Sequence, residues 1–213
     1  MSSLIATNPI AVRNLFRGIS LHENATIVEL GIARGTVTRN ILRLLAKQDT
    51  KVIAIEIHKP FADHARQHVK DDRLEVIHGN AHDIGQIMQE RRLQAQLVIS
   101  GIPHSRIPRE DMLQTMSVIR DSVLEIGGQY LIYNFTRDAG NMQKETFGSG
   151  AVDQRYDLLN FFPPLQISIA TRLPRVRSFE ECPDRSPQRS ARSEEQSPNR
   201  GFVPPMQHLG ASA

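Results

Sequence analysis

The chain has 213 residues, 39% of them hydrophobic, which is enough for one α/β domain with a buried core and some remaining chain. Its single cysteine, Cys182, excludes an intramolecular disulfide framework and a multi-cysteine zinc site, and fits a reducing cytosol. The sequence shows no signal-peptide pattern and no apolar run long enough to span a bilayer, so we expect a cytoplasmic protein, soluble or peripheral to the membrane. The net charge of +3 suits phosphates of nucleic acid or of anionic lipid without choosing between them.

Residues 1–23 are expected to form an N-terminal helical segment. Asn8 and Pro9 are typical of an N-cap followed by proline at the first helical position, and the helix should end near residue 19. One arc of the helical wheel is apolar, with Val12, Leu15, Phe16 and Ile19, and the opposite arc carries Arg13, Asn14 and Arg17. This basic amphipathic helix either covers the core of its own domain or lies in a membrane interface, with Leu15 and Phe16 among the acyl chains.

A strand, a glycine-punctuated turn and a helix follow. Residues 26–30 predict a buried strand, and residues 36–47 carry one apolar stripe at helical spacing. The turn between them has the pattern E-x-G-x-A-x-G, formed by Glu29, Gly31, Ala33 and Gly35. In an open parallel sheet such a turn lies at the carboxyl edge, where ligands bind. The carboxylate of Glu29 suits a cationic ligand, such as the ammonium and sulfonium of S-adenosylmethionine, better than a phosphate, but an ordinary strand-to-helix turn is equally compatible with the pattern.

The next two strands each end beside a polar side chain. Residues 51–57 form a continuous apolar strand in which Glu56 is placed to accept hydrogen bonds from both ribose hydroxyls of an adenosine. Residues 73–79 predict a third strand, and Asn80 follows it, where its side chain can meet an adenine edge. The simpler alternatives are that Glu56 is a solvated strand end and that Asn80 is a turn residue.

The intervening helix, residues 60–69, carries His64 and His68 at i, i+4. This spacing can chelate a metal, but no third ligand is suggested nearby, so we expect an exposed helix face and no metal site.

The second half of the chain predicts fewer elements. We expect strands over residues 96–100, 129–135 and 165–171, a helix over 83–91 and another over 111–125. The polar stretch 136–154, in which Gly148 and Gly150 indicate a loop, predicts little else. The loop from Gly101 to Pro108 emerges at the same sheet edge as the glycine turn, where a substrate would meet a cofactor. Residues 24–174 are therefore assigned to one domain, and residues 175–213, dense in Ser, Pro, Arg and Glu, to a disordered tail.

Four motifs in this order resemble those of class I S-adenosylmethionine-dependent methyltransferases: residues 29–35, 54–57, 78–81 and 98–103. The resemblance covers about residues 26–136. It is greatest to the bacterial phospholipid N-methyltransferases and next to the ribosomal RNA adenine dimethyltransferases. The segment Ser-Gly-Ile-Pro at 100–103 is similar to the Ser-Gly-Leu-Pro type of the lipid enzymes, whereas the RNA enzymes have Asn-Leu-Pro-Tyr. The resemblance implies a Rossmann-like α/β fold with a central, mostly parallel sheet and helices on both faces.

The resemblance also implies S-adenosylmethionine as the cofactor. The residues that it assigns to cofactor binding are Glu29, Gly31, Ala33, Gly35, Glu56, Ile57, Asn80, Ala81 and Ser100. Ser100 and His104 are the implied catalytic residues beside the methyl acceptor, where His104 is suited to take a proton from an amine. The simpler alternative, which we favour, is that His104 is a structural or solvated residue. This chain departs from the family pattern in having Ala33 in place of glycine and Asn80 in place of aspartate.

Three functions follow from these expectations. The first is an N-methyltransferase that acts on the amine headgroup of a phospholipid such as phosphatidylethanolamine, with an anionic membrane surface as partner. The second is an RNA adenine N-methyltransferase, although the chain lacks an aromatic residue after Pro103 to stack on a flipped base. The third is a non-catalytic binding module. The sequence leaves the oligomeric state open.

Overall fold

The computed structural model of the chain describes residues 9–46, 49–124, 126–136, 138–157 and 164–171. The predictions about the tail, including Cys182, and about an N-cap at Asn8 lie outside the described residues.

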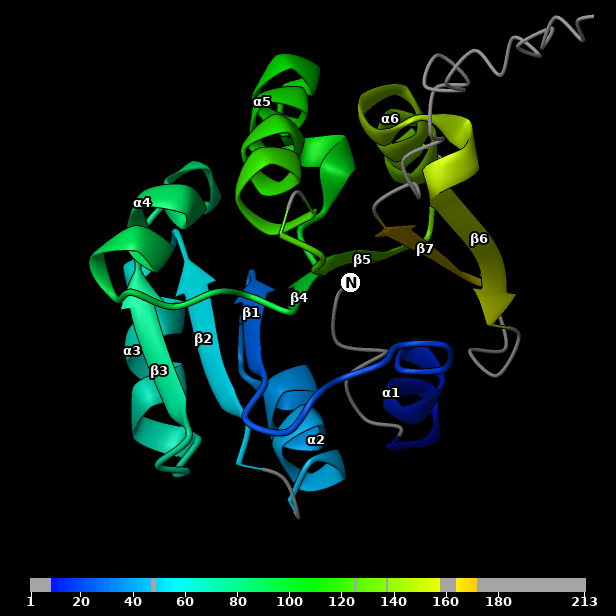
Figure 1. The fold of residues 1–213 in the computed structure, drawn as a ribbon. Coiled ribbons are helices and arrows are strands. Elements are labelled where there is room, and N and C mark those ends of the chain that lie inside the picture. Colours follow the sequence, from blue (N-terminus) through cyan, green and yellow to red (C-terminus); the bar gives the residue numbers. More distant parts are fainter. Residues whose placement is uncertain (1–8, 47–48, 125, 137, 158–163, 172–213) are drawn as a thin grey trace, which may run out of the picture. The chain divides into compact units, whose positions relative to one another are not determined.

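The described residues form one seven-stranded sheet in the order β3-β2-β1-β4-β5-β7-β6 (Figure 1). The strands are β1 Thr26–Leu30, β2 Lys51–Glu56, β3 Leu74–His78, β4 Leu97–Ser100, β5 Gln129–Asn134, β6 Val152–Asp157 and β7 Leu165–Thr171. Strands β1 to β5 are parallel, and β7 pairs antiparallel with both β5 and β6. Because the chain leaves β1 toward β2 on one side and returns as β4 on the other, the order reverses at β1, where α/β proteins bind ligands.

Helices cover both faces of this sheet (Figure 1). They are α1 Pro9–Leu15, α2 Thr36–Leu44, α3 Lys59–His68, α4 Ile84–Glu90, α5 Arg109–Ile119 and α6 Asp138–Phe147. The buried side chains of α4, α5 and α6 form one apolar cluster with the sheet, and those of α1 and α2 form another on the opposite face, with α3 beside it. Strands β1, β2 and β4 are apolar nearly throughout because both of their faces are covered.

The expected elements are present, with ends that differ by a few residues, and the last strand has the predicted bounds of 165–171. Two elements were not predicted, because α6 lies in the polar stretch 136–154 and β6 begins in it. Strand β6 is an edge strand paired only with β7, and it alternates only partly between buried and exposed residues. Its ladder with β7, rather than its own apolar content, holds it in place.

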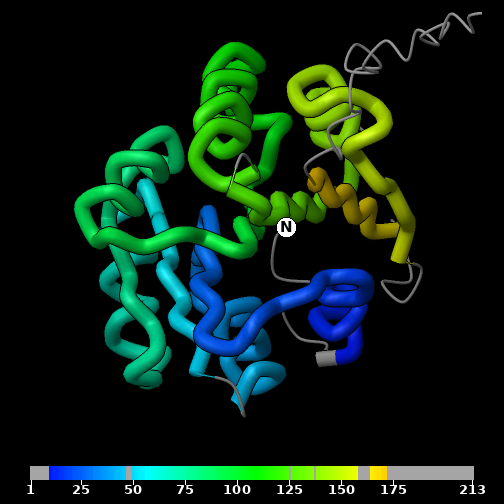
Figure 2. Tube along the Cα trace, viewed as in Figure 1, coloured from blue at the N-terminus to red at the C-terminus, as the bar shows by residue number. Residues whose placement is uncertain are grey.

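Helix α1 covers the core of its own domain. Val12 and Leu15 are fully buried, so the expectation that Leu15 enters a membrane interface is wrong. Arg155 of β6 donates from Nη2 to the carbonyl oxygens of Asn14 and Leu15, at 2.9 and 3.2 Å, and so satisfies the C-terminal end of the helix. Figure 2 shows α1, in dark blue, below β6, in yellow. Within the described part of the chain, every helix is too short or too polar to cross a bilayer.

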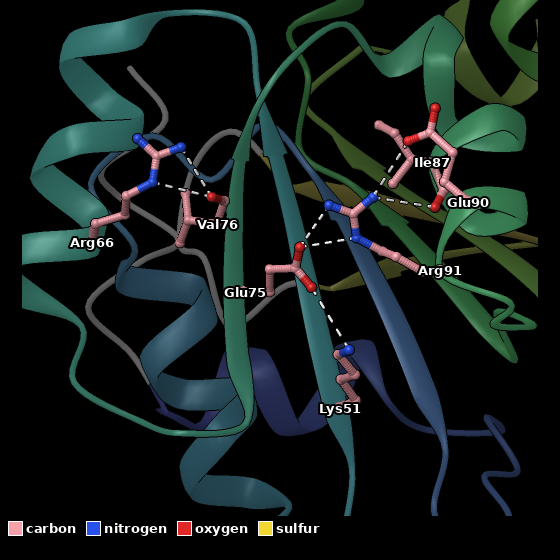
Figure 3. A network of polar contacts seen from close by, with 7 residues as sticks. All are labelled: Lys51, Arg66, Glu75, Val76, Ile87, Glu90 and Arg91. Carbon is pink, nitrogen blue, oxygen red and sulfur yellow. Dashed lines mark hydrogen bonds and ion pairs between the residues drawn. The ribbon is translucent and has the colours of Figure 1, made fainter.

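The outer strand β3 is fixed by polar contacts (Figure 3). Glu75 accepts two hydrogen bonds from Arg91, at 2.7 and 2.9 Å, and lies 3.6 Å from Lys51 of the neighbouring strand. On the same strand, Arg66 of α3 donates from Nε and Nη2 to the Val76 carbonyl, at 3.1 and 3.0 Å. The arginine thereby covers part of the open edge of the sheet, which limits pairing with other chains.

Candidate active site

The predicted site residues lie at the carboxyl ends of the four adjacent strands β1 to β4. The Gly31 amide donates to the Ile55 carbonyl at 2.8 Å, and the Gly101 amide donates to the Leu30 carbonyl at 3.2 Å. The loops after β1 and β4 therefore leave the sheet side by side.

The glycine turn is built on left-handed backbone. Gly31, Ala33 and Gly35 have φ values of 81°, 48° and 70°. Glycine takes this conformation freely, whereas an alanine there costs about 1–2 kcal/mol. The Ala33 amide donates to Glu56 Oε2 at 3.0 Å, which helps to hold the alanine in this conformation.

Glu56 joins the turn to the end of β2. Besides the Ala33 amide, it accepts a 2.9 Å hydrogen bond from the His58 amide through Oε1. The side chain is 4% exposed, so the alternative that Glu56 is a solvated strand end is wrong. A carboxylate accepts about four hydrogen bonds, so capacity remains for two ribose hydroxyls. The next residue, Ile57, is 58% exposed and presents an apolar surface beside that carboxylate.

Glu29 is a buried carboxylate with one free oxygen. Its Oε2 accepts a 2.6 Å hydrogen bond from the Thr38 hydroxyl, while Oε1 has no hydrogen-bond partner among the described residues. The residue is 1% exposed, and this burial raises its pKa to about 8, with the nearby Glu56 adding to the rise and the Thr38 hydrogen bond opposing it. With this pKa the carboxyl of Glu29 is mostly protonated at neutral pH when no ligand is bound. A cationic ligand would favour the ionised form and would supply the missing partner of Oε1.

Asn80 caps a short 3-10 helix, Ala81–Asp83, after β3. Its Oδ1 accepts a 3.1 Å hydrogen bond from the His82 amide. Asn80 is therefore the turn residue that the simpler alternative expected, but it is also exposed, and its oxygen keeps a second lone pair.

The loop after β4 is closely packed. Ser100 is fully buried, and the Ile102 amide lies 3.5 Å from its Oγ. A Cβ added at Gly101 would lie 2.2 Å from the hydroxyl oxygen of Tyr133, and one added at Gly31 would lie 3.2 Å from Ile102 Cγ1. Glycine is required at 101 because any side chain there would collide with the tyrosine.

His104 is held inside this loop by the end of β5. Asn134 accepts a 2.7 Å hydrogen bond from the Phe135 amide through Oδ1, so its Nδ2 donates to His104 Nδ1, 3.0 Å away. The histidine is 6% exposed, and burial lowers its pKa to about 4, with the Ile102 backbone opposing part of the shift. His104 is therefore neutral at physiological pH and a weak base, poorly suited to take a proton from an alkylammonium.

Thr38, Tyr133 and Asn134 were not assigned roles from the sequence. Thr38 has a local signal, because it stands in the first turn of the helix after the glycine turn. Tyr133 and Asn134 have none, because only the pairing of β5 with β4 brings them to the loop at 101–104.

On α3, the His64 and His68 rings stack with centroids 4.0 Å apart. Among the described residues, no group of three or more His, Cys, Asp or Glu side chains is arranged to hold a metal ion.

The fold is that of the class I methyltransferases, a Rossmann-like α/β fold. It is similar to TrmN from Thermus thermophilus, with a TM-score of 0.57 and 12% identity, over 79% of this chain and 50% of that one. It is also similar to a precorrin-6y C5,15-methyltransferase from Geobacter metallireducens, with a TM-score of 0.58 and 12% identity, over 78% of this chain and 90% of the other. The chain thus spans half the length of TrmN.

In sequence, the chain is similar to an ornithine lipid N-methyltransferase from Singulisphaera acidiphila. The two are 28% identical over 129 residues, which are 60% of this chain and 67% of that protein. No family model matches the sequence.

Proposed function

We propose that this S-adenosylmethionine-dependent methyltransferase acts on the amine headgroup of a lipid, such as phosphatidylethanolamine, at a membrane surface. The observation that carries the proposal is the pair of buried carboxylates, Glu29 and Glu56, at adjacent strand ends around a left-handed turn. The lipid assignment draws on the Ser-Gly-Ile-Pro segment at 100–103 and on the similarity to the Singulisphaera lipid enzyme.

The residues at the strand ends suit this cofactor. The free oxygen of Glu29 would accept from the ammonium of the methionine end, and the backbone of Gly31, Ala33 and Gly35 would lie against that end. Glu56 would hold the ribose with its unused lone pairs. The exposed face of Ile57 would pack on the adenine, and Asn80 and Ala81 would border its edge.

The bound cofactor supplies an electrophilic methyl group that is already activated as a sulfonium. The protein therefore has to hold the acceptor nitrogen in line behind the methyl carbon, which is a matter of positioning and needs no nucleophilic side chain. Ser100 and His104 would act by shaping the loop that borders the acceptor, since both are buried. The low pKa of His104 leaves solvent to take the proton of the ammonium before attack.

The outer face of α1 would meet the membrane. Ile10 is 59% exposed, Arg13 is exposed at i+3 on the same helix, and Arg17 is exposed in the turn that follows the helix. Each basic residue near an anionic surface contributes about 1 kcal/mol, an attraction that salt screens. This face replaces the buried Leu15 as the expected contact.

Calorimetry with S-adenosylmethionine tests the cofactor site. Glu56→Ala should weaken binding by roughly 1.5–3 kcal/mol, because it removes charge-assisted hydrogen bonds to the ribose. Glu56→Gln keeps an acceptor oxygen and should lose less. An unmodified protein that gives no heat at millimolar ligand would overturn the cofactor assignment and favour a non-catalytic binding module.

Vesicles test the acceptor. We expect methyl transfer to phosphatidylethanolamine in vesicles that also contain phosphatidylglycerol, detected by mass spectrometry of the lipid. The double variant Arg13→Glu/Arg17→Glu should no longer sediment with these vesicles, while its cofactor affinity stays unchanged. Lys70→Glu/Arg92→Glu carries the same change of charge on other exposed residues and should still sediment. If the unmodified protein does not bind vesicles but methylates RNA, the lipid assignment is wrong.

A further inference from the structure

Tyr133 belongs to β5, and its side chain packs against the loop that borders the acceptor. Its neighbour Ile132 pairs with Ser100, so Tyr133 stands one residue beyond the end of the β4–β5 ladder, at the carboxyl edge of the sheet. Its hydroxyl oxygen would be 2.2 Å and its Cζ 2.7 Å from a Cβ at Gly101. The phenol therefore rests directly on the Gly101 backbone, in space that a side chain would otherwise fill.

The phenol of Tyr133 is also close to Glu29, one of the residues proposed to bind the cofactor. Burial raises the pKa of Tyr133 well above its usual value, and the charge of Glu29 raises it further. The hydroxyl is therefore neutral across physiological pH, with oxygen lone pairs that can accept weak hydrogen bonds. Glu29 and Tyr133 lie on the same face of the sheet, because Ile27 of β1 and Leu131 of β5, two residues earlier on each strand, share one apolar cluster.

Two loops converge beside this hydroxyl. The position of a Cβ at Gly31 is 3.2 Å from Ile102 Cγ1, so the glycine turn touches the loop after β4 next to Gly101. A sulfonium held between Glu29 and Gly31 would face the acceptor nitrogen across this contact. Of the side chains beside it, Glu29 carries a carboxyl whose ionised form a cation would favour, and Tyr133 carries a neutral hydroxyl.

We infer that the hydroxyl oxygen of Tyr133 contacts the methyl group that is transferred and orients it toward the acceptor. Carbon-bound hydrogens next to a sulfonium are polarised and form weak C–H···O hydrogen bonds. In the transfer, the C–S bond breaks and its electron pair stays on sulfur, while the nitrogen lone pair forms the new N–C bond. Tyr133 neither gains nor loses a proton. The inference rests on the cofactor part of the proposed function and not on the lipid.

Tyr133→Phe tests the contact, since it removes only the oxygen. With S-adenosylmethionine labelled with ¹³C at the methyl group, we expect the methyl proton resonance of the bound cofactor to lie downfield in the unmodified protein and to move upfield in the variant. The dissociation constant should change less than about threefold, whereas kcat on phosphatidylethanolamine vesicles should fall about tenfold or more.

Tyr156→Phe is the matched control. Tyr156 lies on the edge strand β6 and is 48% exposed, so its replacement should leave the methyl resonance unchanged. Equal methyl resonances in the unmodified protein and in Tyr133→Phe would overturn the inference even if the lipid is methylated. A Tyr133-dependent resonance without lipid methylation would support it and overturn only the lipid assignment. An unmodified protein that binds no cofactor would overturn both.

Discussion

The part of the site formed by β1, β2 and β3, which we call the open part, has exposed residues beside its two buried carboxylates, whereas the part formed by β4 and β5, the packed part, is buried nearly throughout. In the first part, Glu29 keeps a free oxygen, and Ile57 and Asn80 are exposed. In the second part, Ser100 and His104 are buried, and Tyr133 fills the space above Gly101. The first part offers several groups whose partners a ligand would supply. The second fixes the shape of a loop mainly through contacts within the protein, although His104 Nε2 also lacks a hydrogen-bond partner among the described residues.

From this difference we expect the open part to bind the cofactor and the packed part to align the acceptor. Unused hydrogen-bonding capacity and exposed apolar surface suit the binding of a cofactor, which contributes its own donors. A closely packed loop suits the alignment of an acceptor, because alignment to within a fraction of an ångström depends on rigid support. Substitutions in the open part should therefore act mainly on cofactor affinity, and those in the packed part mainly on stability and turnover.

The largest expected effect tests the packing behind β5. Leu15 of α1 is fully buried in the cluster that also contains Leu131 and Tyr133. Leu15→Ala should lower the free energy of unfolding by about 2–5 kcal/mol, because it leaves a cavity in that cluster. Urea denaturation measures the change. Ile10→Ala on the exposed face of the same helix is the control and should change stability by less than about 0.5 kcal/mol. Equal effects would show that α1 does not support the packed part.

The next largest effect is the dependence of stability on the ionisation of Glu29. The pKa of Glu29 is raised to about 8 from an ordinary value of 4.5, so the folded protein binds this proton more tightly than the unfolded chain. The resulting stability is fully present below pH 4.5 and is lost as the pH rises through about 8. Glu29→Gln has no charge to bury, so it should be more stable than the unmodified protein at pH 9, by on the order of 3 kcal/mol.

Urea denaturation at several pH values checks this prediction. At pH 4 the two proteins should be nearly equally stable, because Glu29 is then protonated in both the folded and the unfolded state. A difference that does not depend on pH would contradict the assigned pKa. Thr38→Val removes the hydroxyl whose hydrogen bond lowers the pKa of Glu29, so it should raise that pKa further and extend the loss of stability to higher pH.

The smallest expected effect tests the open part. Ala33→Gly relieves a left-handed alanine at φ 48° and should stabilise the protein by up to about 1 kcal/mol, since the greater freedom of glycine in the unfolded chain offsets part of the gain. It also removes a methyl group from the turn beside the cofactor site, so we expect equal or higher affinity for S-adenosylmethionine by calorimetry. Weaker binding would show that the Ala33 side chain itself contacts the cofactor.

Much of the open part could be predicted from the sequence because its residues stand at fixed offsets from strand ends. A buried strand followed by glycines indicates a turn at the sheet edge, and this reasoning placed Glu29, Gly31 and Glu56 together. The same reasoning gave both alternatives for Asn80, and its role toward a ligand remains a prediction.

Three features were decided only by tertiary structure. Helix α1 has an apolar arc that fits a membrane or a core equally well, and the cluster that buries Leu15 decided for the core. Strand β6 is too polar to be recognised alone and exists through its ladder with β7. Tyr133 and Asn134 reach the loop at 101–104 only because β5 lies next to β4. Local patterns determine where the chain turns, but contacts between distant segments depend on which strands become neighbours, and no single segment carries that information.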